Sequence, residues 1–316
     1  MKAAQYSRYG GEEVIEINQN ATKPIPKKGQ ILVEVHAASL NPFDWKLRSG
    51  YMKEMIPLQF PFTVGGDFSG VVVQLGPSAD QEFKVGDQVY GQALVLNGGS
   101  GAFAEFASSN VANTSLMPKN ADFLESSALP LVGASAIQAL EDYIKLTSGQ
   151  KIVIHGGAGG IGHIAVQLAK HLGAYVASTI SSNDIDFVKS IGADMAIDYK
   201  SQKFEEMIHG FDAVFDTVGE ETTDKSFRVL KKNGILVSML GEPNQKQAQD
   251  YGVTAIGQNT KTTSPKLNRL KELVETGAIK PHIDKVFPFE RIRQAFKHLE
   301  KNHPRGKVVL ALLGYS

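Results

Sequence analysis

The spacing of hydrophobic residues changes near residue 121 of this 316-residue chain. Before that point, short apolar and β-branched runs are separated by glycine, proline and asparagine turns. Clear examples are 31–35, 70–76, 85–91 and 103–106. Runs of this length between turn residues predict the short strands of a small closed β unit.

From residue 122 onward, helical and strand patterns alternate. Segment 126–145 has helical spacing, and either Asp122 or Ser126 is placed to cap its start. Short apolar runs separated by helices are typical of a buried parallel sheet. Such runs lie at 152–154, 175–179, 195–197, 213–215 and 235–237. Helices are expected at 161–172, 184–191, 266–276 and 290–301, a polar surface loop at 242–251 and a final strand at 308–312.

Composition and charge exclude several classes of protein. Hydrophobic residues make up 42% of the chain and charged residues 21%, and 33 Lys and Arg balance 33 Asp and Glu. Nucleic acid is therefore not an expected partner. Nor is a membrane, because no apolar run reaches the ~20 residues of a spanning helix. The absence of cysteine excludes disulfides and thiolate metal sites. A cytoplasmic location is expected, because a chain without cysteine fits a reducing compartment and the first residues lack the apolar core of a signal peptide.

A glycine-rich motif follows the strand at 152–154 and opens the helix at 161–172. In dinucleotide-binding folds the glycines allow a tight turn, a close backbone approach to pyrophosphate and helix packing on the strand. The phosphates lie at the positive end of the helix. We therefore expect cofactor pyrophosphate to bind the residues of this motif: Gly157, Ala158, Gly159, Gly160, Ile161 and Gly162.

The end of the next strand indicates which nicotinamide cofactor binds. NAD-binding units usually place Asp or Glu there for the ribose 2′-hydroxyl, but residues 178–183 carry no carboxylate. The pattern favours NADPH, with Ser181 and Ser182 facing the 2′-phosphate. Against this, the loop has no Arg or Lys and Asp184 follows it. Ser182 or Asn183 also suits a helix cap.

Several motifs together are similar to one family. They lie at 41–50, 64–72, 85–91, 128–130, 157–170 and 305–310. The chain resembles the medium-chain dehydrogenase/reductase superfamily, in its zinc-less, zeta-crystallin-like quinone oxidoreductase branch. The resemblance implies an α/β protein in which 1–121 and 259–316 form a GroES-like β-barrel catalytic domain. Residues 122–258 would form a Rossmann domain with a doubly wound parallel sheet, and the protein would be a homodimer.

The resemblance also bears on metal. Zinc-dependent members carry Cys at the position of Asn41 and Gly-His-Glu at 65–67, where this chain has Gly-Gly-Asp. No metal is therefore expected. Zinc acidifies an alcohol or polarises a simple ketone, so its absence favours acceptors that are already electrophilic, namely quinones and α,β-unsaturated carbonyls.

The family pattern implies three candidate catalytic residues. Asn41 would lie beside the nicotinamide and hydrogen-bond a carbonyl or ribose, or would only shape the turn before Pro42. Tyr51 would donate to a developing oxyanion, or would pack in the barrel. Lys46 would stabilise that charge, or would be solvated. Asp44 is expected to be a structural partner.

Further cofactor contacts are carried over from the family. Ser135 would lie near the nicotinamide ribose and Tyr199 beside the adenosine phosphate. The nicotinamide edge would be lined by Thr217, Val218, Gly219, Leu240 and Gly241, and phosphate or ribose would be reached by Arg305 and Lys307. The favoured hypothesis is hydride transfer from NADPH to a small electrophilic quinone or enone. The alternative is a non-catalytic NADPH-binding protein, either crystallin-like or RNA-binding.

Overall fold

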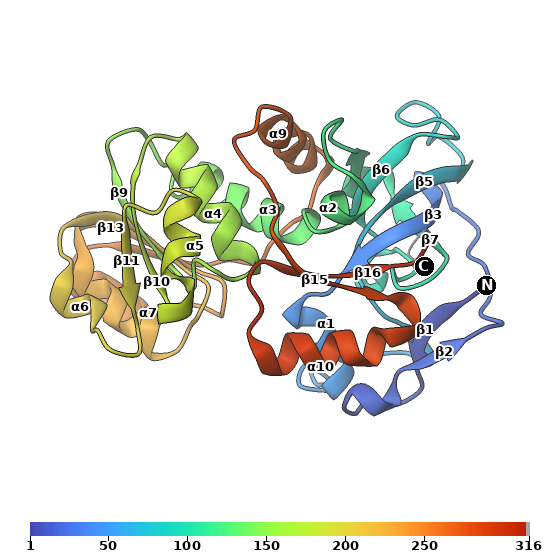
Figure 1. The fold of residues 1–316 in the computed structure, drawn as a ribbon, viewed down its shortest axis with the longest axis horizontal. Helices are drawn as coiled ribbons and strands as arrows, with labels where there is room; N and C mark the ends of the chain where they lie inside the picture. The colour runs from blue at the N-terminus through green and yellow to red at the C-terminus, as the bar shows by residue number, and fades with distance from the viewer. Residues whose placement is uncertain (314–316) are drawn as a thin grey trace. The chain divides into compact units, whose positions relative to one another are not determined.

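The computed structural model describes residues 1–313 and divides the chain into two compact units (Figure 1). Unit 1 contains Met1–Leu131, Thr262–Glu275 and the chain from Pro281 on, and unit 2 contains Val132–Lys261 and Thr276–Lys280. The predicted cut after residue 121 lies ten residues before the observed boundary at Leu131, and the cut after residue 258 lies three residues before the boundary at Lys261. The short return of the chain to unit 2 at Thr276–Lys280 was not predicted.

Unit 1 is built on a mixed sheet in the order β15-β16-β3-β5-β6-β8, with β7 also paired to β3. A smaller sheet has the order β2-β1-β4. The strands are β1 (Ala3–Tyr6), β2 (Glu16–Asn18), β3 (Gln30–Ser39), β4 (Phe62–Thr63), β5 (Asp67–Leu75), β6 (Gln88–Gln92), β7 (Phe106–Asn110), β8 (Thr114–Leu116), β15 (Ile283–Pro288) and β16 (Lys307–Ala311). The helices are α1 (Pro42–Ser49), α2 (Phe123–Ser127), α9 (Ser264–Glu275) and α10 (Ile292–Asn302).

Both ends of the chain contribute to the core of unit 1. Strand β16 pairs antiparallel with β3, with Val309 opposite Ser39, and Phe296 of α10 contacts Phe103 with ring centroids 6.2 Å apart. The apolar side chains of these strands are almost fully buried. This arrangement confirms the GroES-like unit formed by both chain ends.

The predicted strand at 103–106 is only partly present, since β7 begins at Phe106. The preceding residues bond to two other segments instead: Phe103 N–H donates to the Val64 carbonyl, and Glu105 N–H donates to Lys2. The alternation of buried and exposed side chains expected at 103–106 is absent, because Phe103 and Ala104 are both buried and Glu105 and Phe106 are both partly exposed. Residues 103–105 bond to separate segments and so join no long ladder.

Unit 2 contains a parallel sheet in the order β11-β10-β9-β12-β13-β14. Its strands are β9 (Lys151–His155), β10 (Tyr175–Ile180), β11 (Met195–Asp198), β12 (Phe211–Asp216), β13 (Leu230–Ser238) and β14 (Thr254–Gly257). The chain winds outward from β9 in one direction and then from β12 in the other. This reversal confirms the doubly wound Rossmann sheet.

Helices connect the strands of unit 2. They are α3 (Pro130–Ile137), a π-helical turn at Gln138–Tyr143, α4 (Gly160–His171), α5 (Ile185–Ser190), α6 (Phe204–Met207), α7 (Glu221–Ser226) and α8 (Gln245–Tyr251). Within residues 1–313, no helix combines the length and apolar content needed to cross a membrane.

Two helical predictions need correction. The expected helix at 126–145 is divided in two. The first helix, α2, is capped by Asp122, which accepts a hydrogen bond from Glu125 N–H at 2.8 Å. The second helix, α3, begins at Pro130. Proline suits the first turn of a helix but not its interior. The expected loop at 242–251 contains α8, which Asn244 caps and Gly252 ends at φ 65°. Its one buried residue, Ala248, gives too weak a periodicity to detect.

Candidate cofactor and catalytic sites

The glycine motif forms the turn between β9 and α4. A Cβ on Gly157 would lie 2.0 Å from the Ser178 hydroxyl, and one on Gly162 would lie 2.1 Å from the Gly156 carbonyl. These two glycines are required by packing. A Cβ on Gly159 would lie 3.3 Å from the Gly156 carbonyl, a tight contact without overlap, so packing within the protein constrains Gly159 less than it does Gly157 and Gly162. The first helical N–H groups have no intrahelical acceptor and suit an anion.

Most of the predicted cofactor residues gather at one edge of the sheet of unit 2. Parallel strands end at the same edge, where ligands of such sheets bind. Each predicted segment directly follows a strand: 157–162 follow β9, Ser181 and Ser182 follow β10, Tyr199 follows β11, 217–219 follow β12, and Leu240 and Gly241 follow β13. The strand order places the glycine turn between the loops after β10 and β12, at the switch point of the sheet.

The loop after β12 is held by a buried carboxylate. Asp216 accepts hydrogen bonds from Val218 N–H at 2.8 Å, from Gly219 N–H at 3.1 Å and from the Thr223 hydroxyl at 2.5 Å. The Thr217 hydroxyl donates to the His155 carbonyl at 2.7 Å, which ties this loop to the start of the glycine turn. Val218 keeps 47% of its surface exposed at this rigid edge.

Residues missed by sequence reasoning lie beneath this edge. His155 is fully buried between the Thr179 hydroxyl at 2.8 Å and the Ser226 hydroxyl at 2.9 Å. Burial lowers the pKa of His155 to about 4. Ser226 donates its own proton to the Thr222 carbonyl, so it accepts from the histidine. A polar residue ending an apolar strand, just before the glycine motif, was the available signal.

The loop after β10 carries no carboxylate at the strand end. Ser181 is extended and precedes a short 3₁₀ turn, Ser182–Asp184, and neither Ser181 nor Asp184 makes a capping bond with its side chain. Ser182 is exposed. The Ser181 side chain is thus not used as a helix cap.

Ser135 contacts the segment that directly follows β14. Its side chain is fully buried, and its hydroxyl is 2.8 Å from that of Thr260. Gln258 donates to its carbonyl at 3.0 Å. Its predicted contact with the nicotinamide ribose stays a prediction.

In unit 1, Asn41 and Lys307 belong to one buried polar network. The Lys307 ammonium donates to the Asn41 side-chain oxygen at 2.5 Å and to the Leu40 carbonyl at 2.9 Å, and it lies 3.7 Å from the Asp67 carboxylate. Asp67 also accepts from the Asn41 amide at 2.9 Å and from Gln92 at 3.0 Å. Lys307 and Asn41 are each 3% exposed. Lys307 was predicted to reach phosphate or ribose, but its ammonium faces this network.

Burial controls the charges in this network. It lowers the pKa of Lys307, against the attraction of Asp67, and it raises the pKa of Asp67, against the attraction of Lys307. Asp44 accepts from the Asn41 backbone N–H at 2.7 Å and closes the first turn of α1. Its pKa is raised to about 7, chiefly by burial. Asp44 is thus structural, as predicted, and Asp67 and Gln92 are the partners that the sequence did not reveal.

Lys46 and Tyr51 lie close together at the other end of α1. The Lys46 ammonium is 6.0 Å from the Tyr51 ring centroid and 5.9 Å from that of Trp45. Tyr51 is 76% exposed, so it does not pack in the barrel. The helix is anchored by Arg48, which is buried and bonds Glu300 at 2.8 Å. Tyr51 and Lys46 are therefore accessible, whereas Asn41 is enclosed.

Arg305 is half-buried on the turn before β16. It lies near His282, whose pKa is lowered mainly by burial and also by the Arg305 charge, while Asp284 opposes the shift. His303 ends α10 at φ 46°.

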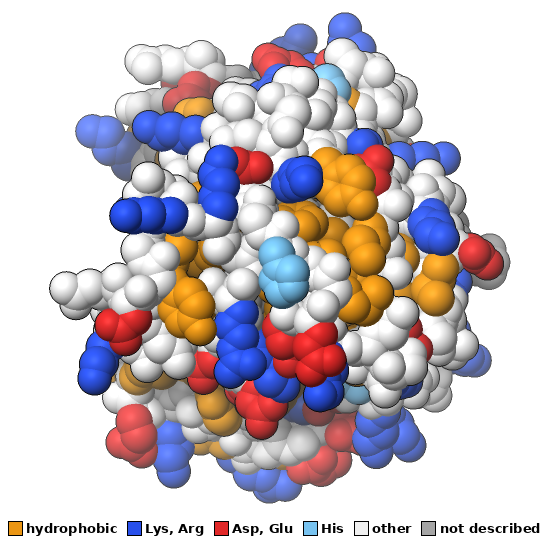
Figure 2. Space-filling view, turned by 90° about the vertical axis from the view of Figure 1, so that its left-hand side faces the viewer, with side chains coloured by type: hydrophobic (Ala, Val, Ile, Leu, Met, Phe, Trp, Pro, Cys, Tyr) orange, Lys and Arg blue, Asp and Glu red, His pale blue; other side chains and the backbone are white. Residues whose placement is uncertain are grey.

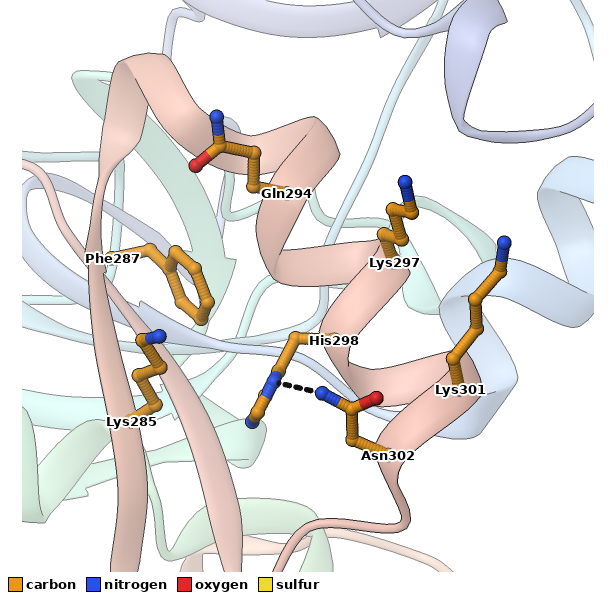
Figure 3. Close-up of a pocket in the computed structure, with 7 residues that line it drawn as sticks. All are labelled: Lys285, Phe287, Gln294, Lys297, His298, Lys301 and Asn302. Atoms are coloured by element: carbon orange, nitrogen blue, oxygen red, sulfur yellow. Dashed lines mark hydrogen bonds between the residues drawn. The ribbon is translucent and has the colours of Figure 1, made fainter.

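A hollow lies between β15 and α10 in unit 1 (Figure 3). Lys285, Lys297 and Lys301 surround it, and His298 is fixed by Asp284 at 2.6 Å and Asn302 at 2.8 Å. It contains none of the predicted site residues. We therefore do not assign it to the cofactor or to the catalytic residues.

The donor set at Asn41 does not fit zinc. The chain has no cysteine, and the Lys307 ammonium, which bonds the Asn41 oxygen and lies 3.7 Å from the Asp67 carboxylate, would repel a metal cation. Among residues 1–313, no group of three or more His, Cys, Asp or Glu is arranged to hold a metal ion.

Two family models match the chain. An alcohol dehydrogenase GroES-like domain matches residues 27–119, and a zinc-binding dehydrogenase domain matches residues 191–310. The second description names zinc, although the cysteines of thiolate zinc sites are absent here.

Relatives cover nearly the whole chain. The chloroplastic NADPH-dependent alkenal/one oxidoreductase of Arabidopsis thaliana is 38% identical over 98% of this chain and 79% of its own length. The quinone oxidoreductase structure from Coxiella burnetii is 32% identical, with a TM-score of 0.91 over 99% of each chain. A mycobacterial protein solved in complex with NADPH is 27% identical, with a TM-score of 0.88 over 99% of this chain and all of its own. The chain belongs to the medium-chain dehydrogenase/reductase superfamily, among its quinone and alkenal oxidoreductases.

Proposed function

We propose that this protein is a zinc-independent reductase that transfers hydride from NADPH to quinones or α,β-unsaturated carbonyls. The carrying observation is the set of five loops at one edge of the parallel sheet, in which the glycine turn lies beside a strand end without a carboxylate. An acid at that position would repel a 2′-phosphate. Its absence suits NADPH, the cofactor named in the Arabidopsis relative and bound in the mycobacterial structure.

The cofactor is held mainly by unit 2. The N–H groups of the glycine turn bind the pyrophosphate, Ser181 and Ser182 face the 2′-phosphate, Tyr199 lies beside the adenosine, and 217–219 and 240–241 contact the nicotinamide half. Bound NADPH supplies the hydride. The sequence-based assignments of Ser135 and Arg305 are kept as proposals.

The acceptor is polarised by residues of unit 1. When hydride reaches the β-carbon of an enone, or a quinone, negative charge develops on oxygen. The Tyr51 hydroxyl donates a hydrogen bond to that oxygen, and the Lys46 ammonium stabilises the charge. Tyr51 and Lys46 suit this role because both side chains reach the surface. A proton from water or from Tyr51 completes the reduction.

The hydrogen bonds that Asn41 makes within the protein leave it one amide hydrogen to donate to a ligand. Its oxygen accepts from Lys307, and one of its two amide hydrogens is given to Asp67. The second amide hydrogen is its remaining donor, so we propose that Asn41 donates to a carbonyl or ribose oxygen. Lys307 acts on this site through Asn41.

The charge distribution agrees with a small-molecule substrate. On the face in Figure 2, basic and acidic side chains are interspersed and hydrophobic side chains lie between them. A nucleic-acid partner usually requires a basic patch. This face therefore gives the RNA-binding alternative no support.

Steady-state oxidation of NADPH tests the proposal, with a panel of quinones, 2-alkenals and saturated aldehydes. We expect turnover with the first two groups and little with the third. Tight NADPH binding with no turnover above background on any electrophile would instead support the non-catalytic alternative. The homodimer and the cytoplasmic compartment stay predictions, and size-exclusion chromatography with light scattering would test the first.

A further inference from the structure

The loop after β11 lies directly beside the loop after β10. The two strands are parallel neighbours, with Ile180 opposite Asp198, and Tyr199 N–H donates to the Ile180 carbonyl at 3.1 Å. Both loops therefore leave the sheet at the same edge. Lys200 is the second residue of its loop, as Ser182 is of the other.

Lys200 is an exposed cation without an acidic partner. Among residues 1–313, no carboxylate oxygen lies within 4.0 Å of its ammonium. By contrast, Lys203, three residues on, pairs with Glu206 at 2.9 Å, and Lys170 pairs with Asp194 at 2.8 Å. The Lys200 ammonium lies 6.0 Å from the centroid of the Tyr199 ring. Tyr199 is itself expected to contact the adenosine phosphate of the cofactor.

The turn that carries Lys200 is fixed by Asp198. One carboxylate oxygen accepts from Lys200 N–H at 3.1 Å and the other accepts from the Ser201 hydroxyl at 2.8 Å. The carboxylate is thus held by its own turn. Asp184 and Asp186 are acidic residues close along the chain to the Ser181–Ser182 loop, so a dianionic phosphate bound there needs a cation to offset its charge.

We infer that Lys200 binds the 2′-phosphate of NADPH and is a specificity-determining residue for this cofactor. The inference rests on the proposed function. The loop after β10 supplies hydroxyl and N–H donors but no positive charge, and a lysine on a flexible stem supplies the point charge that phosphate requires. The cation comes from a different strand, which explains why the loop after β10 has no Arg or Lys.

Binding of 2′,5′-ADP and of 5′-AMP to the whole protein, measured by isothermal titration calorimetry, tests the inference. The two probes differ in the 2′-phosphate, and neither requires turnover. We expect K200A to weaken 2′,5′-ADP about tenfold, or 1.4 kcal/mol, and to leave 5′-AMP unchanged. K200E should weaken 2′,5′-ADP further, and K200R should retain most of the affinity. K203A, a nearby lysine with a partner, should behave as wild type.

Each contrary outcome has a defined meaning. If K200A keeps the wild-type preference for 2′,5′-ADP, or weakens both probes equally, the inference about Lys200 is wrong while the NADPH assignment stands. The inference is also wrong if K203A matches K200A, because the effect would then be general surface charge. If wild type binds both probes equally, the NADPH assignment fails as well.

Discussion

Lys307 donates to the Asn41 side-chain oxygen at 2.5 Å, inside a network where both residues are 3% exposed. A lysine ammonium can only donate and a carboxylate can only accept. The amide of Asn41, between Lys307 and Asp67, therefore has one orientation. The same ammonium would repel a metal cation, so one residue both fixes the amide and makes the donor set unsuitable for zinc.

Replacing Lys307 with Met should unfold unit 1 readily. The variant leaves the Asp67 carboxylate buried without its cation, which costs roughly 3–5 kcal/mol. The double variant K307M/D67N removes both charges and should recover most of the loss in urea denaturation. If Lys307 also acts through Asn41, the double variant folds but keeps a reduced kcat. Full recovery of kcat would show that Lys307 is only structural, and K285M, at an exposed lysine of unit 1, is the control.

Gly159 and Gly162 should separate cofactor binding from folding. G162A forces a Cβ to within 2.1 Å of the Gly156 carbonyl and should lower the melting temperature by several degrees. G159A brings a Cβ only to 3.3 Å from the Gly156 carbonyl, a tight contact that a small shift relieves, so its melting temperature should fall less than that of G162A. It should bind NADPH roughly tenfold more weakly, about 1.4 kcal/mol. Calorimetric binding and thermal unfolding check both. Unchanged NADPH affinity in G159A would argue against a phosphate at this turn.

Placing an acid after β10 should reverse the cofactor preference. S181D puts a carboxylate where the 2′-phosphate is expected, and its repulsion should raise the KM for NADPH at least roughly tenfold, about 1.4 kcal/mol, while the KM for NADH falls or holds. S190D, on the exposed end of α5 in the same unit, controls for added charge. Equal effects of S181D on both cofactors would contradict the assignment.

Removing the Tyr51 hydroxyl should affect rate and not stability. Tyr51 is 76% exposed, so Y51F should melt as wild type does. Loss of one oxyanion donor typically costs on the order of 100-fold in kcat. Steady-state kinetics with a quinone and an alkenal measure it, and Y175F, a partly exposed tyrosine of unit 2, is the matched control. Wild-type kcat in Y51F would remove Tyr51 from the mechanism.

His155 should make unit 2 acid-sensitive. Its pKa of about 4 in the folded protein lies below the usual 6.5, so the unfolded chain binds a proton first as the pH falls. Stability is then lost between about pH 6.5 and 4, by roughly 1.4 kcal/mol per pH unit over that window. H155Q should flatten this part of the profile in urea denaturation, at the cost of lower stability at pH 7. An unchanged slope would contradict the prediction, and H209Q, at an exposed histidine, should match wild type.

The fold of each unit could be predicted because its signals are local. The glycine motif between a strand and a helix marks a nucleotide turn, and the motifs at both chain ends identify the GroES-like unit. The contacts that could not be predicted depend on strand register. Nothing local to Lys307 indicates that it meets Asp67, and nothing local to Lys200 indicates that its loop follows the strand next to β10.

Local polarity misled at 242–251. This segment is polar because α8 buries little, and an exposed short helix carries almost no periodic signal. The contacts of Ser135 could not be read from its neighbours in the sequence either, because its hydroxyl lies 2.8 Å from that of Thr260, more than a hundred residues away.

The pairing of β16 with β3 has a consequence for biosynthesis. Unit 2 is nearly one continuous stretch, so its sheet can assemble as soon as that stretch has been made. The sheet of unit 1 cannot be completed so early, because β3 pairs with β16, which lies about 270 positions later along the chain. Until β16 has been synthesised, the edge of β3 is open to pairing with other chains. We expect nascent chains to need a chaperone during this interval, and we expect variants that slow β16 docking to aggregate before they lose activity.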